Sequence, residues 1–139
     1  MNESRPADSP SASSFNVVNP PTIEVFESET RIFASRGRWL HPLFDLEAVI
    51  SADGRDPRKL EVRDKIVGRA AALLLAYLRI GRVSAGILSR PARQVLARFA
   101  IPFTFETLVD RIDCQTETLL MEETDPDRAY ALLRERAGR

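Results

Sequence analysis

Residues that commonly ligate metals or form covalent cross-links are scarce in this chain. Its 139 residues include one cysteine, Cys114, and one histidine, His41, so no internal disulfide can form. A zinc site built on three histidine or cysteine ligands would need more of them. We therefore expect no metal and no cofactor, and the cysteine content fits a reducing cytoplasm.

Long apolar runs, catalytic motifs and net charge are missing as well. The longest apolar run, Ala70–Leu78, is far shorter than the roughly 20 residues that span a bilayer. No signal-peptide pattern is visible at the N-terminus, and no G-x-S-x-G, G-x-x-x-x-G-K-[ST] or G-x-G-x-x-G motif occurs. A net charge of +0 gives no general attraction to nucleic acid or membrane. We expect a soluble cytoplasmic protein with no membrane partner, and the sequence gives no strong case for a nucleic-acid polymer as partner.

The composition is that of a globular domain with a polar leader. The hydrophobic fraction of 44% and the charged fraction of 29% suit one domain with a real core. Residues 1–21 are rich in Ser, Pro, Asn and Ala and bury too little apolar surface to offset chain entropy. We predict a disordered leader over residues 1–21 and a single domain over residues 22–139.

The central stretch Asp64–Gly81 has the pattern of a buried helix with both ends marked. Asp64 is a favourable N-cap, and Gly81 suits the left-handed residue that closes a helix. Apolar residues cover nearly all faces from residue 70 to residue 78, which predicts neighbours on more than one side.

The other elements follow from alternation, helical spacing and caps. We predict a hairpin over Thr22–Ser35, a short helix over Trp39–Ile50, strands over Arg82–Ser89, Phe103–Val109 and Thr118–Met121, and helices starting at Ser89 and Asp125. Strands joined by helices call for parallel neighbours with right-handed crossovers. The predicted fold is an α/β, three-layer α-β-α sandwich with a mixed sheet and an N-terminal antiparallel hairpin.

A basic region suggests an anion site at two helix starts. Every charged residue from Lys65 to Arg98 is basic, whereas acids dominate from Glu106 to Asp127. The free N–H groups and the dipole at a helix start favour anions. The candidate ligand-binding residues are Asp64, Lys65, Gly68, Arg69, Ser89 and Arg90. Two oppositely charged solvated faces would also explain the pattern, and Asp64 and Ser89 would then act only as helix caps.

A family resemblance rests on the segments TIEVF, DKIVGRAAALL, LSRPARQVL and DPDRAYALL, in this order. The chain resembles a small bacterial family, the domain of unknown function 1893 family, over roughly residues 22–135. The resemblance implies a cytidine-deaminase-like fold. It also places the two positions of deaminase zinc ligands at Asp64–Arg69 and Ser89–Pro91, where no zinc ligand stands. Of the family's Cys-Pro-Met-Glu segment, only Met121 and Glu122 match.

Three functions remain open at this point. The first is a non-catalytic module that binds a nucleotide or another small phosphorylated ligand. The second is a metal-independent enzyme that uses Asp64 or Lys65 on a related ligand. The third is a protein-interaction domain, including a homo-oligomer in which the acidic stretch of one copy meets the basic face of another.

Overall fold

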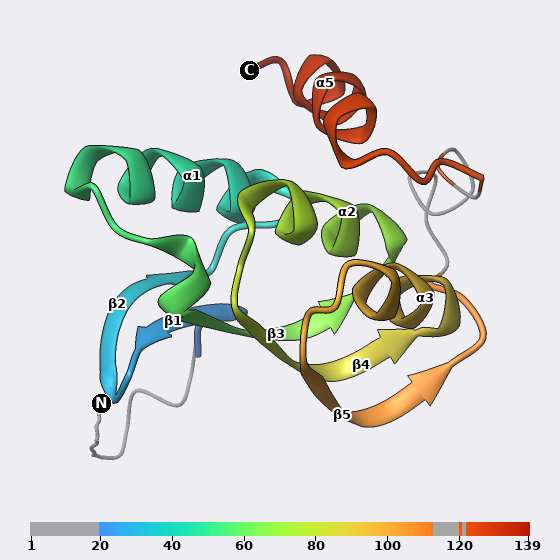
Figure 1. The fold of residues 1–139 in the computed structure, drawn as a ribbon, viewed down its shortest axis with the longest axis horizontal. Helices are drawn as coiled ribbons and strands as arrows, with labels where there is room; N and C mark the ends of the chain where they lie inside the picture. The colour runs from blue at the N-terminus through green and yellow to red at the C-terminus, as the bar shows by residue number, and fades with distance from the viewer. Residues whose placement is uncertain (1–19, 113–119, 121) are drawn as a thin grey trace.

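The computed structural model describes residues 20–112, residue 120 and residues 122–139 (Figure 1). The predicted leader and the predicted strand over residues 118–121 lie almost wholly outside these residues, and Cys114 lies outside them. In the described ranges, no helix has the length and apolar content needed to cross a membrane.

The N-terminal hairpin is confirmed. Strands β1 (Ile23–Glu27) and β2 (Thr30–Ser35) pair antiparallel, with Ile23 opposite Ser35. Ile23 and Val25 are buried, which is the alternation expected of a strand with one face on the core.

Strand β3 (Leu60–Val67) occupies the segment where the central helix was predicted to begin. Leu60 and Val62 are buried on one side, whereas Arg63 points to the solvent side. This period of two is that of a strand. The predicted helix start at Asp64 is therefore wrong, because the segment pairs antiparallel with β1 and parallel with β4 (Arg82–Ser89).

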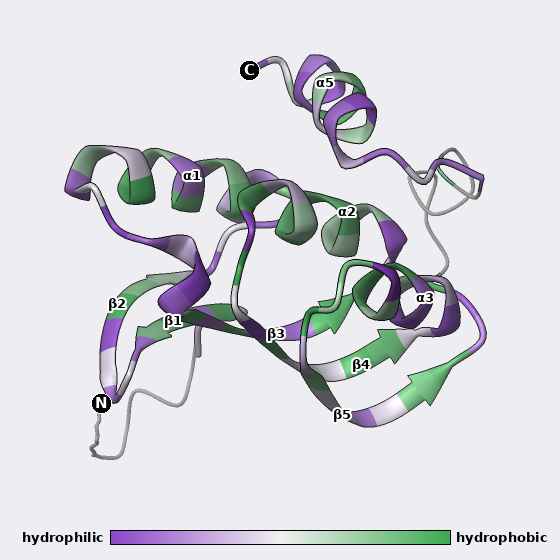
Figure 2. Ribbon diagram, in the orientation of Figure 1, coloured by the Kyte–Doolittle hydropathy of each residue, from purple (hydrophilic) through white to green (hydrophobic). Residues whose placement is uncertain are grey.

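Helix α2 (Arg69–Leu78) follows directly after Gly68. It ends at Arg79, whose φ of +65° closes the helix, so the predicted closure at Gly81 is also wrong. All residues from Arg69 to Leu75 are buried. The prediction of a core helix over residues 70–78 is confirmed, and Figure 2 shows α2 as largely hydrophobic.

Among the described residues the fold is a mixed five-stranded sheet with four helices. The elements not yet named are α1 (His41–Asp53), a short 3-10 turn (Pro57–Lys59), α3 (Arg90–Arg98), β5 (Phe103–Val109) and the last helix, α5 (Pro126–Ala137). The strand order is β2-β1-β3-β4-β5, and β3, β4 and β5 are parallel. The predicted strands over residues 82–89 and 103–109 are confirmed.

The described helices lie on one face of the sheet, so the predicted helical layer on the second face is not found among the described residues (Figure 1). The crossovers that contain α1, α2 and α3 all advance in the same direction across the sheet. Right-handed connections then place these three helices on one face. On the opposite face, the guanidinium of Arg63 lies 4.1 Å over the ring of Phe26.

The last helix, α5 (Pro126–Ala137), packs on α2 on the side away from the sheet (Figure 1). The rings of Tyr77 and Tyr130 are stacked with centroids 3.9 Å apart. The hydroxyl of Tyr130 also donates to Glu47 of α1 at 2.9 Å. Helix α2 is thus enclosed by the sheet, α3 and α5, which explains why it is apolar on nearly all sides.

Candidate functional site

The starts of α2 and α3 lie at one edge of the sheet, because each helix follows the carboxyl end of a parallel strand. Ser89 is fully buried, and its hydroxyl accepts from the N–H of Ala92 at 3.1 Å, so it acts as the N-cap of α3. Gly68 precedes α2 in an extended conformation. Lys65 belongs to β3 and is exposed.

Arg69 is buried, and its guanidinium binds backbone carbonyls instead of pointing into an open site. It is 6% exposed, and its guanidinium donates to the carbonyl oxygen of Leu120 at 2.6 Å and to that of Glu123. A helix that began at Asp64 would place Lys65 and Arg69 one turn apart on a common face, but Lys65 lies in β3 and only Arg69 lies in α2. The hydrogen bonds of Arg69 hold the segment before α5 next to the start of α2.

Arg90 is engaged at the same edge. Its Nε donates to the carboxylate of Asp110 at 2.9 Å, and both side chains are largely exposed. An exposed pair of this kind contributes little to stability. The carboxylate of Asp110 would therefore compete only weakly with an anionic ligand for Arg90. Binding such a ligand would break one surface ion pair.

At this edge, the carboxyl of Asp64 has a pKa shifted strongly toward neutral pH. In the sheet, Asp64 lies opposite Ile23 of β1 and opposite Ala85 of β4, and both of these residues are buried. Burial raises the pKa of the Asp64 carboxyl from 3.8 to about 7, although hydrogen bonds from the backbone of Ile66 and Lys65 lower it in part. The side chain as a whole is partly exposed.

The edge does not suit the zinc ion of a deaminase. The two helix starts carry Gly68 and Arg69 on α2, and Ser89 and Arg90 on α3, none of which ligates zinc. Within the described ranges, no group of three or more His, Cys, Asp or Glu residues is placed to hold a metal ion.

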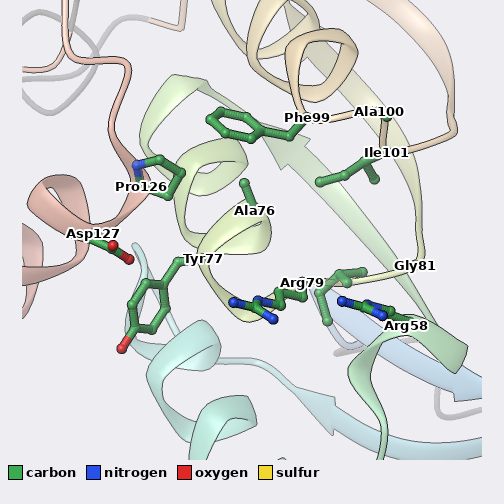
Figure 3. Close-up of a pocket in the computed structure, with 11 residues that line it drawn as sticks. Arg58, Ala76, Tyr77, Arg79, Gly81, Phe99, Ala100, Ile101, Pro126 and Asp127 are labelled. Atoms are coloured by element: carbon green, nitrogen blue, oxygen red, sulfur yellow. The ribbon is translucent and has the colours of Figure 1, made fainter.

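A pocket of about 790 Å³ lies at the opposite end of the strands, where no site is predicted from the sequence (Figure 3). It opens between the last turns of α2 and α3 and the first turn of α5. Its walls are formed by Arg58, Ala76, Tyr77, Arg79, Ile80, Gly81, Phe99, Ala100, Ile101, Pro126 and Asp127.

Two equivalent helix ends form one side of this pocket. At the end of α2, the N–H groups of Arg79 and Ile80 donate to carbonyls of the last turn, and Ala100 and Ile101 repeat the arrangement after α3. Arg79 and Ala100 have φ of +65° and +58°. This is the Schellman closure, in which glycine is the usual left-handed residue.

The loops that carry Arg58 and Arg79 are in backbone contact. The N–H of Gly81 donates to the carbonyl oxygens of Pro57 and Leu60 at 3.1 and 3.2 Å. A Cβ at residue 81 would lie 1.9 Å from the carbonyl oxygen of Arg58, so only glycine fits. The close approach places the two arginines on adjoining walls of the pocket.

The pocket combines unpaired charge with apolar walls. Neither Arg58 nor Arg79 takes part in an ion pair within the described part of the chain. Tyr77, Phe99 and Ile101 supply aromatic and aliphatic surface, and Phe99 is 37% exposed. The arrangement can bind an anion next to a flat apolar group.

The comparisons with known proteins agree with this fold. Residues 22–137 match the family described as Domain of unknown function (DUF1893). The chain is similar to the crystal structure of a DUF1893 family protein (TM1506) from Thermotoga maritima, with a TM-score of 0.72, at 22% sequence identity over 84% of this chain and 80% of that chain. At this identity the likeness shows the fold alone, and no match was found among curated proteins. Since the family match covers most of its length, the chain belongs to the DUF1893 family, a domain of unknown function.

Proposed function

We propose that this domain is a non-catalytic module that binds a nucleotide or another small phosphorylated ligand in the pocket at the ends of α2 and α3. The observation that carries the proposal is the pair Arg58 and Arg79. Both line a pocket of about 790 Å³, and neither forms an ion pair among the described residues.

The chemistry of the walls supports a phosphorylated and partly flat ligand. Guanidinium groups bind phosphate oxygens through paired, charge-assisted hydrogen bonds. The volume falls in the range of pockets that enclose small ligands, roughly 300–1,000 Å³. Phe99 offers ring surface to a base or another planar group, whereas one face of the Tyr77 ring is already stacked on Tyr130. The cytidine-deaminase-like fold implied by the family resemblance is part of the proposal, since that fold family handles nucleotides.

A purely structural role does not explain why an arginine occupies position 79. A cation in the last turn of a helix interacts favourably with the helix dipole, by about 0.3–1 kcal/mol. At a φ of +65°, however, glycine would avoid a steric cost of about 1–2 kcal/mol. The conformation therefore disfavours arginine, and such backbone outliers are concentrated at functional sites.

The carboxyl edge of the strands is the competing location for the same ligand. Lys65, Gly68 and Arg90 remain candidates there, whereas Ser89 is fully buried and caps α3. Open α/β sheets commonly bind ligands at that edge. Arg69 contributes less than expected, because its guanidinium binds two backbone carbonyls.

The alternative of a metal-independent enzyme is favoured by one observation. The carboxyl of Asp64 has a pKa raised to about 7 by burial, which is suitable for a general acid or base at neutral pH. Turnover that Asp64→Asn abolishes, in a variant that still folds and binds, would support this alternative.

The test is a thermal-shift screen of nucleotides and sugar phosphates, followed by calorimetric titration of the best compound. Arg79→Gly removes the charge and relieves the left-handed backbone, so binding should weaken about tenfold or more without loss of stability. Ala100→Gly is the matched control, because it relieves the same backbone conformation and removes no charge. Lys65→Ala reports on the competing edge. Unchanged affinity in Arg79→Gly would exclude the pocket, and the loss of affinity in Lys65→Ala instead would place the ligand at the edge.

A further inference from the structure

We infer that the ligand carries an amino group at the end away from its phosphate, and that the carboxylate of Asp127 accepts a hydrogen bond from it. This inference rests on the proposed function and adds the chemistry of the second end of the ligand.

Asp127 lies in the first turn of α5, where it is exposed and lines the pocket. Its backbone N–H donates to the carboxylate of Asp125 at 2.9 Å, so the first turn is capped by Asp125 and not by Asp127. Figure 3 shows the carboxylate of Asp127 turned toward the space between α5 and the end of α2. This carboxylate forms no hydrogen bond or ion pair within the described ranges.

The pocket is therefore polarised. Arg58 and Arg79 supply positive charge on two adjoining walls, and Asp127 supplies negative charge at the start of α5. A ligand that is only an anion would satisfy the arginines and would be repelled by Asp127. A molecule with phosphate at one end and an N–H donor at the other satisfies both walls, because an ionised carboxylate only accepts hydrogen bonds.

A mononucleotide with an exocyclic amino group meets these requirements. Its phosphate matches the guanidinium groups, and its base is flat and presents two apolar faces to rings such as Phe99. Its amino group donates to an acceptor such as Asp127. The simpler role of Asp127, favourable interaction with the dipole of α5, needs no ligand and predicts no preference among ligands.

The experiment compares AMP with purine riboside 5′-monophosphate, which lacks only the amino group. Calorimetric titrations use the full chain as wild type, Asp127→Asn and Glu29→Gln. Glu29 is an exposed acid at the tip of the hairpin, and its variant controls for the loss of one negative charge. Wild type and Glu29→Gln should bind AMP about tenfold more tightly than the deamino compound, as expected for a hydrogen bond to a charged group.

In Asp127→Asn, the preference should fall toward equal affinity, because the amide has lost its charge and can also donate. The deamino compound should then bind more tightly than it does to wild type, since the repulsion of its phosphate is gone. Equal binding of both compounds to wild type, or a preference that Asp127→Asn leaves unchanged, overturns the inference while leaving the proposed function intact. Failure of AMP and of every other phosphorylated compound to bind overturns both.

Discussion

The guanidinium of Arg69 donates a 2.6 Å hydrogen bond to the carbonyl oxygen of Leu120, which is 51 positions later in the chain. A second bond from the same group reaches the carbonyl of Glu123, and α5 begins shortly after it. The start of α2 thereby fixes the segment that leads to Pro126 and Asp127. One wall of the pocket at the far end of α2 consequently depends on an arginine at its near end.

Replacing Arg69 by methionine should strongly destabilise the fold. The change leaves two backbone carbonyls without their donor, and we expect a loss of about 2–4 kcal/mol in the free energy of unfolding. Arg69→Lys should cost less, because the ammonium retains the charge and can still donate. Urea denaturation measures both, with Arg82→Met as an exposed control of the same type. A loss as small as that of the control would contradict the tethering role.

Gly81 and Gly54 offer a contrast between two reasons for glycine. A Cβ at residue 81 would lie 1.9 Å from a backbone oxygen, whereas nothing lies within 4 Å of one at residue 54, where φ is +64°. Gly81→Ala should cost about 3 kcal/mol or more, the upper end of the range for overpacking, because it forces two backbone segments apart. Gly54→Ala should cost only about 1–2 kcal/mol through its backbone conformation. Thermal unfolding should rank Gly81→Ala as the less stable variant, and only that variant should also displace Arg58 and weaken ligand binding.

The two left-handed helix ends predict that glycine substitutions stabilise the protein. Ala100→Gly should raise the free energy of unfolding by about 1 kcal/mol, since it removes the clash of Cβ at positive φ. Arg79→Gly should gain less, because the favourable interaction of the charge with the α2 dipole is lost. Denaturant titration of both variants checks this, and a clear destabilisation by Arg79→Gly would mean that its guanidinium has a structural role.

Local patterns were sufficient to predict most of the elements. The hairpin around Ser28, the start of α3 at Ser89 and the start of α5 at Asp125 each carry a turn or cap whose partner lies within a few residues. Strand β3 was missed because Ile66 is also spaced correctly for the apolar face of α2. The alternation of Leu60 and Val62 with charged residues was the available signal.

The candidate sites depended on longer-range structure. The predicted strand order lacks β3, so the sequence does not show that the three crossovers advance in the same direction across the sheet. Without that direction, it cannot be predicted that the helices share one face of the sheet. The bonds of Arg69 to Leu120 and Glu123 join segments that no local pattern relates. Arg58 and Arg79 come together because Gly81 brings their loops into contact, which sequence spacing does not reveal.

The carboxyl of Asp64 predicts that stability decreases as the pH rises through the acid range. The unfolded chain releases this proton near pH 3.8, whereas burial makes the folded chain retain it until about pH 7. Between these values the folded state binds the extra proton, so the free energy of unfolding should fall by about 1.4 kcal/mol per pH unit at the steepest point. The contribution of Asp64 is fully present below pH 3.8 and is lost above about pH 7.

Asp64→Asn isolates this effect, because an amide of the same shape does not titrate. The variant should be more stable than wild type at pH 8 by about 2–4 kcal/mol, and its stability should be nearly flat from pH 5 to 8. The other described groups with a shifted pKa interfere little in this window, and the pKa of Arg55 is raised, so this guanidinium stays charged throughout. The pKa of Glu123 is lowered by hydrogen bonds from the backbone, so this carboxylate is already ionised in the window, and Tyr130 has a pKa raised from 10.0, so it titrates only at higher pH. Urea denaturation at several pH values gives both curves. Parallel curves for wild type and Asp64→Asn would show that Asp64 ionises at an ordinary pKa, and would remove the observation that favours an acid–base role for this residue.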